Sequence, residues 1–94
     1  MEYNIKEPEF TIRLEIDKTK VIVHIPEFSK LTPSVYKKFG ARIYELLEFF
    51  QGQGYEGLLT GILPKNTKLV KLATLLGAEY LYSLDNGYDI YRLV

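Results

Sequence analysis

Apolar side chains occupy every second position over residues 10–16, and polar or charged side chains fill the positions between them. Such alternation is typical of a strand with one buried face. The polar residues 17–20 interrupt the pattern, and a second apolar run follows at residues 21–25 before Pro26. The two runs predict a β-hairpin near the start of the chain.

A helical period replaces the alternation after Thr32. Thr32 is a favourable N-cap residue, and Pro33 suits the first helical position because its missing N–H needs no partner there. The spacing predicts a helix that runs to about Gln51. Its apolar face comprises Val35, Phe39, Ile43, Leu46, Leu47 and Phe50, and its exposed face comprises Lys37, Lys38, Arg42, Glu45 and Glu48.

The stretch GQGYEG at residues 52–57 has the G-x-G-x-x-G spacing of a dinucleotide-binding loop. Such a loop follows a strand and opens a helix, because the free N–H groups of the helix N-terminus hold the pyrophosphate. Here the order is reversed, since the helix comes first and the apolar run 57–63 follows as a buried strand. The glycines therefore predict a helix C-cap and a turn.

Three further elements complete the chain. Asn66 or Thr67 can cap a second helix that ends at Gly77. Two strands follow at residues 79–84 and 88–93. They are joined by Asn86-Gly87, a strong signal for a two-residue hairpin turn. A two-residue turn pairs Tyr82 with Tyr91 across the strands.

These elements predict an α/β (α+β) fold with the order ββαβαββ. A strand, a long helix and another strand form a crossover unit, so residues 21–25 and 58–63 should be parallel neighbours in a mixed sheet. The two helices should cover that sheet. We expect one domain over residues 1–94, with residues 1–9 as a flexible N-terminal segment.

Composition restricts the class of function. The 94 residues are 47% hydrophobic, with 12 basic and 12 acidic residues, so no global field attracts nucleic acid or a membrane surface. The absence of cysteine and the single His24 exclude a thiolate or multi-histidine metal site. The start of the chain lacks the apolar core of a signal peptide, and no apolar run is long enough to span a bilayer. We expect a soluble, cytoplasmic protein.

The element order, together with residues 63–93 and above all 66–77, resembles the C-terminal two-thirds of the GNAT superfamily of N-acetyltransferases. In that family an Asn follows the fifth strand, a helix ends at a glycine, and a hairpin closes the sheet. The resemblance implies a GNAT-like fold. Active members also hold the pyrophosphate of acetyl-CoA on a glycine-rich helix start, for the electrostatic reason given above.

The chain departs from active members at two places. No register of residues 30–43 yields the family's G-x-G or G-x-A, and the last small residue is replaced by Phe39 or Ile43 according to the alignment. The tyrosine that protonates the leaving thiolate in many members corresponds to Ala73, which has no proton to donate. The resemblance therefore implies a truncated, degenerate member that needs no cofactor.

A closer resemblance is to small acetyltransferase-like proteins of tailed bacteriophages, including internal virion proteins of short-tailed phages. These proteins likewise have a lysine-rich helix start, an Asn-Thr pair, a short helix and a Gly-Ala before the last hairpin. It implies a phage-encoded module in the host cytoplasm or the virion. The matching residues are Lys37, Lys38, Asn66, Thr67, Leu76, Gly77 and Ala78.

Two functions follow as alternatives. The first is a non-catalytic module that binds another protein or a second copy of itself, because tyrosine is enriched at protein interfaces and a closing hairpin has an edge strand. The second is an acetyl-CoA-dependent N-acetyltransferase with Glu27 as general base, Lys37 and Lys38 on the phosphates, and Asn66 on the pantetheine arm. The interface of the non-catalytic module would comprise Tyr80, Tyr82, Tyr88, Tyr91 and Arg42.

Overall fold

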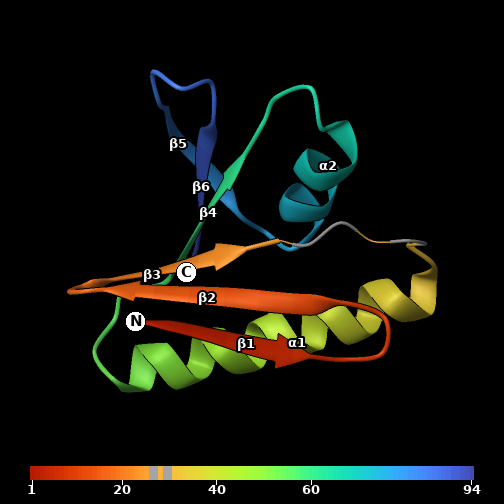
Figure 1. Cartoon of the computed structure of the whole chain (residues 1–94), viewed down its shortest axis with the longest axis horizontal. Helices are drawn as coiled ribbons and strands as arrows, with labels where there is room; N and C mark the ends of the chain where they lie inside the picture. The colour runs from red at the N-terminus through yellow and green to blue at the C-terminus, as the bar shows by residue number, and fades with distance from the viewer. Residues whose placement is uncertain (26–27, 29–30) are drawn as a thin grey trace.

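A six-stranded mixed sheet carries the fold, and both helices pack against it (Figure 1). The computed structural model describes residues 1–25, 28 and 31–94. Along the chain the elements are β1 (Glu2–Lys6), β2 (Thr11–Asp17), β3 (Lys20–His24), α1 (Pro33–Gly52), β4 (Leu58–Ile62), α2 (Thr67–Leu75), β5 (Glu79–Ser83) and β6 (Asp89–Leu93).

The strand order across the sheet is β1-β2-β3-β4-β6-β5. β3 and β4 are parallel, as the crossover through α1 requires, whereas every other neighbouring pair is antiparallel. The parallel ladder comprises the pairs Val21↔Leu58 and Ile22↔Leu59. Beyond these pairs the two strands run in different directions (Figure 1). The predicted α/β class and mixed sheet are confirmed.

The observed order is βββαβαββ, with one strand more than predicted. In place of the flexible segment expected for residues 1–9, Glu2–Lys6 form β1 and pair with β2 along its whole length. The terminal ammonium of Met1 also donates a hydrogen bond to the carbonyl of Ile16 at 3.3 Å. β1 is an exposed edge strand, so its own side chains give a weak apolar signal, and pairing with β2 fixes it.

Both ends of α1 follow the predicted capping chemistry. Thr32 Oγ1 accepts a hydrogen bond from the Val35 N–H at 3.2 Å, and Pro33 opens the helix. At the other end Gly54 has φ +96°, and its N–H donates to the Gln51 carbonyl at 3.1 Å. The Tyr55 N–H donates to the Phe50 carbonyl at 3.0 Å, which completes a Schellman motif. GQGYEG is therefore a C-cap, as predicted.

The same motif ends α2. Gly77 has φ +91° and donates its N–H to the Thr74 carbonyl at 3.0 Å. Between the two helices, Gly57 permits a close approach of β4 to the end of β6. A Cβ atom on Gly57 would lie 2.3 Å from the Leu93 carbonyl oxygen. Glycine is thus required at this position for the β4–β6 pairing.

The core lies between one face of the sheet and the two helices. Phe39 of α1 is completely buried and makes edge-to-face contacts with Phe10 and Phe28, at ring-centroid distances of 5.3 and 5.2 Å. α2 contributes Leu72 and Leu76 to the same cluster. Buried strand residues of this cluster are Ile12, Leu14, Val21, Val23, Leu58 and Leu93.

The closing hairpin has a different register from the one predicted. The Leu84 N–H donates to the Tyr88 carbonyl at 2.7 Å, so the loop contains three residues and its last, Gly87, has φ +95°. A bulge between Tyr80 and Tyr82 then shifts the ladder again. Tyr91 consequently pairs with Tyr80, and the predicted pairing of Tyr82 with Tyr91 is wrong.

Candidate functional site

The residues proposed for catalysis and cofactor binding are Glu27, Lys37, Lys38 and Asn66. Glu27 lies outside the described residues. Asn66 follows β4 and caps α2, since its Oδ1 accepts a hydrogen bond from the Leu69 N–H at 3.4 Å. Lys37 is exposed on α1. The Asn66 amide therefore has a structural role as the N-cap of α2.

The positions that correspond to the family's glycine-rich loop and proton donor are part of the core. Phe39 is 0% exposed, Ile43 is 4% exposed, and Ala73 is 2% exposed. Phe39 and Ile43 lie well inside α1, where backbone amides are engaged in helical hydrogen bonds. No free amides are presented at these positions, and the side chains fill the space between helix and sheet.

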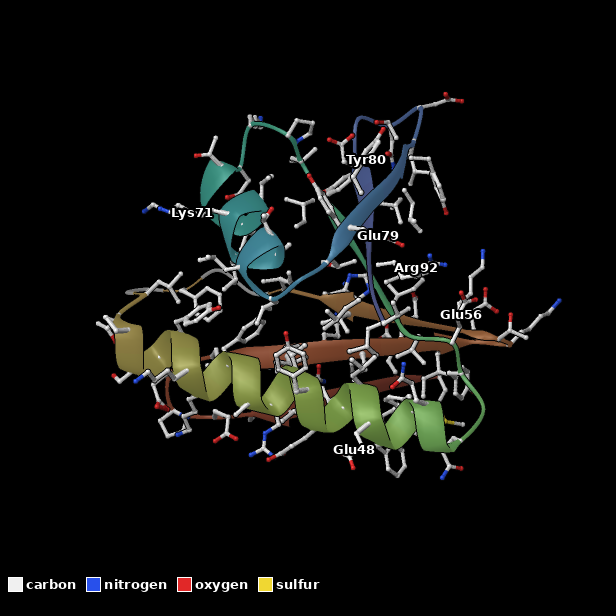
Figure 2. All side chains as sticks on the ribbon, turned by 180° about the vertical axis from the view of Figure 1, so that it is seen from behind. Glu48, Glu56, Lys71, Glu79, Tyr80 and Arg92 are labelled. Atoms are coloured by element: carbon white, nitrogen blue, oxygen red, sulfur yellow. The ribbon has the colours of Figure 1, made fainter. Side chains whose placement is uncertain are left out.

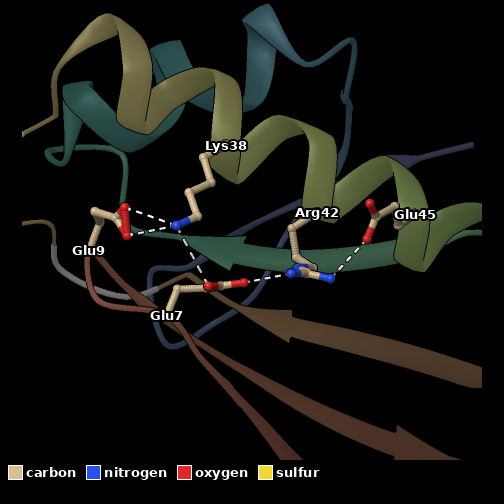
Figure 3. A network of polar contacts seen from close by, with 5 residues as sticks. All are labelled: Glu7, Glu9, Lys38, Arg42 and Glu45. Atoms are coloured by element: carbon tan, nitrogen blue, oxygen red, sulfur yellow. Dashed lines mark hydrogen bonds and ion pairs between the residues drawn. The ribbon is translucent and has the colours of Figure 1, made fainter.

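The cations on the first half of α1 are paired with carboxylates from elsewhere in the chain (Figure 3). Lys38 Nζ lies 3.0 Å from Glu9 Oε1 and 3.7 Å from Glu7 Oε2. Arg42 Nη2 lies 2.6 Å from Glu7 Oε1, and Arg42 Nη1 lies 2.9 Å from Glu45 Oε2. Both cations thus form ion pairs with carboxylates of the β1–β2 connection.

This network explains why cations are tolerated near the positive end of a helix. Cations in the first half of a helix oppose the helix dipole, and here carboxylates of the protein itself lie beside them. The side chain of Glu7 is 15% exposed. The hydrogen bond from Arg42 lowers the pKa of Glu7, and hydrogen bonds to Glu9 and Glu7 raise the pKa values of Lys38 and Arg42. Lys38 and Arg42 therefore join α1 to the β1–β2 connection.

The tyrosines of the closing hairpin divide into one half-buried and three exposed rings. Tyr91 is half-buried and packs edge-to-face against Tyr80 at a centroid distance of 5.9 Å. Tyr80, Tyr82 and Tyr88 are 54%, 46% and 40% exposed. The Tyr80 hydroxyl is 2.8 Å from Ser83 Oγ, which donates to Asp89 at 2.6 Å. The hairpin thus presents large apolar rings to solvent.

Two of these rings lie on the face of the sheet opposite the core. On β4 and β6, Leu58 and Leu93 are paired core residues, so the next pair, Leu59↔Arg92, faces the other way. Gly61↔Ile90 shares that outer face, and a Cβ on Gly61 would lie 3.5 Å from the Tyr88 ring. Tyr82 pairs with Ile90. We call Ile22, Leu59, Tyr82, Tyr88 and Ile90 the outer-face strip.

Charged residues border this strip. Arg92 Nη1 lies 2.9 Å from Glu56 Oε1, and Arg92 Nη2 lies 2.6 Å from Glu79 Oε1 (Figure 2). The hydrogen bond to Glu79 raises the pKa of Arg92. A groove of about 420 Å³ runs between this cluster, Tyr82 and Lys20. The consecutive apolar residues Leu58 and Leu59 were a sequence signal that both faces of β4 are apolar. The other members of the strip could be assigned only from the pairing of β5 and β6.

The described residues restrict two other kinds of site. Among them, no group of three His, Cys, Asp or Glu residues is placed to hold a metal ion. Neither of the described helices is long and apolar enough to cross a membrane.

Comparisons with known proteins add no relative to this description. No family model matches the chain, and searches of curated proteins and of solved structures find no match either. The resemblance to GNAT acetyltransferases therefore stays a prediction from the sequence.

Proposed function

We propose that this protein is a non-catalytic binding module that acts through protein–protein interaction. Its contact surface is the closing hairpin together with the outer-face strip. The observation that carries the proposal is the exposure of Tyr80 and Tyr82 on β5 and of Tyr88 just before β6. A tyrosine ring buries a large apolar area at little entropic cost, so such rings contribute strongly to interfaces.

The borders of the surface fit the same function. Arg92 lies beside the strip, and Glu56 and Glu79 hold its guanidinium in place. An apolar centre with a charged rim is the usual anatomy of a protein interface. Arg42, which the sequence analysis assigned to the interface, is instead joined to Glu7 and Glu45 on α1. The proposed surface therefore excludes it.

The module is proposed to be non-catalytic because of the residues that stand at the positions active members of the family use. Phe39 and Ile43 occupy the core where active relatives have a glycine-rich loop, and Ala73 stands where they have a tyrosine. An acetyltransferase-like ancestry and a phage source belong to the same proposal and rest on the sequence resemblance. The partner would then be a host factor, a virion protein or a second copy of the chain.

The test is capture of a partner from the native source with purified protein, followed by light scattering of the complex. We expect the double variant Tyr82→Ala/Tyr88→Ala to lose the partner, because it removes two rings from the strip. Tyr3→Ala is the matched control, since Tyr3 is 48% exposed on β1 at the other edge of the sheet. Equal binding by wild type and the double variant would remove this surface from the proposal.

A second candidate is an acetyl-CoA-dependent N-acetyltransferase. It rests on the sequence resemblance, in which Asn66 matches the Asn that follows the fifth strand of the family. Thermal unfolding with CoA distinguishes the two. A ligand with a dissociation constant of about 10 μM stabilises a protein by about 2.7 kcal/mol at about 1 mM. Each kcal/mol raises the melting temperature of a domain of this size by about 4–8 °C, so such a gain would raise it by about 11–22 °C and support the enzyme.

A further inference from the structure

A second groove lies on the helix layer, away from the outer-face strip. It has a volume of about 460 Å³ and lies between the start of α1 and one face of α2. The two N-terminal turns lie at the same end of the molecule in both overall views (Figures 1 and 2). Its lining comprises Leu31, Thr32, Pro33, Tyr36, Lys68, Lys71, Leu72 and Leu75.

The floor of the groove is apolar and partly open to solvent. Leu72 is buried and closes the bottom, whereas Leu75 is 60% exposed and Leu31 is 39% exposed. Lys68, Lys71, Leu72 and Leu75 recur at helical spacing and therefore share one face of α2. The adjacent side of α2, with Ala73 and Leu76, packs toward the core. The groove thus places an exposed leucine beside two lysines.

Among the described residues of the two segments that line the groove, the charged side chains have one sign. Residues 28–44 and 57–78, which supply its two walls, contain no Asp or Glu, and all their charged residues are Lys or Arg. The chain as a whole is neutral, so its carboxylates are concentrated elsewhere. Lys38 and Arg42 in the first segment are paired with Glu7 and Glu9 on the far side of α1.

Lys68 and Lys71 differ from those two cations. Neither forms an ion pair with a residue that the structure describes. Lys71 extends away from α2 in Figure 2. Two lysines that flank an apolar floor and pair with no carboxylate in the described part of the chain are complementary to a ligand that is itself apolar and acidic.

We propose that this groove binds an acidic amphipathic helix of a partner protein. Its apolar side chains contact Leu75, Leu72 and Tyr36, and its carboxylates pair with Lys68 and Lys71. A groove between two helices accepts a third helix through anchors at positions i, i+3, i+4 and i+7. The proposal does not depend on the closing hairpin, because the two surfaces share no residue.

The experiment is fluorescence anisotropy with a synthetic labelled peptide. The probe has Leu at positions i, i+3, i+4 and i+7 and Glu at the intervening polar positions, and a matched peptide has Gln in place of every Glu. We expect the Glu peptide to bind at least about tenfold more tightly than the Gln peptide, since only its carboxylates can pair with Lys68 and Lys71. Added salt should weaken its binding.

Three variants locate the binding. Lys68→Glu/Lys71→Glu should weaken the Glu peptide at least about tenfold, because it replaces two attractions with repulsions. The matched control Lys18→Glu/Lys20→Glu makes the same charge change at the β2–β3 turn. This turn precedes β3, whereas the groove residues follow it, so the control should leave binding unchanged. Leu75→Gln should weaken binding without loss of stability, because Leu75 is 60% exposed.

Each contrary outcome is specific. Equal binding of the Glu and Gln peptides, no binding of either, or no effect of the double lysine variant overturns the proposal. Lysine-dependent binding to phosphatidylserine vesicles without peptide binding assigns the groove to a membrane surface and also overturns it. So does a dimer in light scattering that Leu75→Gln dissociates. Tyr82→Ala/Tyr88→Ala should leave peptide binding intact, so failure here is distinguishable from failure of the hairpin surface.

Discussion

Arg42 donates a hydrogen bond from Nη2 to Glu7 Oε1 at 2.6 Å, across a sequence separation of 35 residues. The bond joins the middle of α1 to the connection between β1 and β2. Lys38 strengthens the same link from one turn earlier, at 3.7 Å from the second carboxylate oxygen of Glu7. The first edge strand is thereby tied to the helix as well as to its neighbour β2.

The stability of the protein should depend on the ionisation of Glu7. Because Arg42 lowers the pKa of Glu7 in the folded protein, its contribution is fully present above the ordinary value of 4.5 and is lost as the pH falls through the lowered pKa. Glu7→Gln should therefore destabilise the protein at neutral pH. Urea unfolding measures the free energy of unfolding of this variant and of wild type. The difference between them should be smaller well below pH 4.5 than at neutral pH. A constant difference would contradict the assignment.

The two glycines of the α1 C-cap should respond oppositely to alanine. Gly54→Ala should cost about 1–2 kcal/mol, because φ +96° is a left-handed conformation that a Cβ disfavours. Gly52→Ala should stabilise by about 0.4–1 kcal/mol, since Gly52 is helical and a Cβ there would meet nothing within 4 Å. Denaturant unfolding of both variants measures the two changes. Equal effects would show that the Schellman motif does not form.

Phe39 should be among the most costly residues to truncate. Phe39→Ala removes a ring that is 0% exposed and contacts two other aromatic residues, so we expect a loss of about 3–5 kcal/mol. Phe49→Ala on the same helix is the control, because Phe49 is 58% exposed. It should change stability by about 0.5 kcal/mol or less. Thermal unfolding compares them, and similar melting temperatures would place Phe39 outside the core.

Asn66 should behave as a helix cap. Asn66→Ala should lower the free energy of unfolding by about 1 kcal/mol, because it leaves the Leu69 N–H without its partner. Asn66→Asp should retain most of the stability, since a carboxylate accepts the same hydrogen bond. Unfolding curves of the two variants test this role. A loss as large in Asn66→Asp as in Asn66→Ala would point to another use of the amide.

Local signals in the sequence predicted most of the elements. Thr32-Pro33 marked the start of α1, and Gly54 and Gly77 marked the ends of the helices, because capping depends on residues within one turn of each other. The parallel neighbours β3 and β4 followed from the length of the crossover. The strand β1 was missed because its exposed residues have little apolar contrast until β2 pairs with them.

Non-local pairing explains the errors in the candidate site. Nothing near Lys38 and Arg42 in the sequence reveals that Glu7 and Glu9 will lie beside them. The hairpin register depended on a three-residue loop and on the bulge at Tyr80/Tyr82, whereas Asn86-Gly87 favoured a two-residue turn. Of the four tyrosines assigned to an interface, Tyr80, Tyr82 and Tyr88 are exposed, and Tyr91 is the half-buried partner of Tyr80.

The short ladder between β3 and β4 divides the sheet mechanically. On one side β1, β2 and β3 form an antiparallel unit, and on the other β4, β6 and β5 form a second. Within the sheet the two units are joined by two residue pairs, so the helices and their core contacts carry most of the connection. A pulling force applied to the two ends of the chain should therefore separate β3 from β4 before it disrupts the strand pairing within either unit.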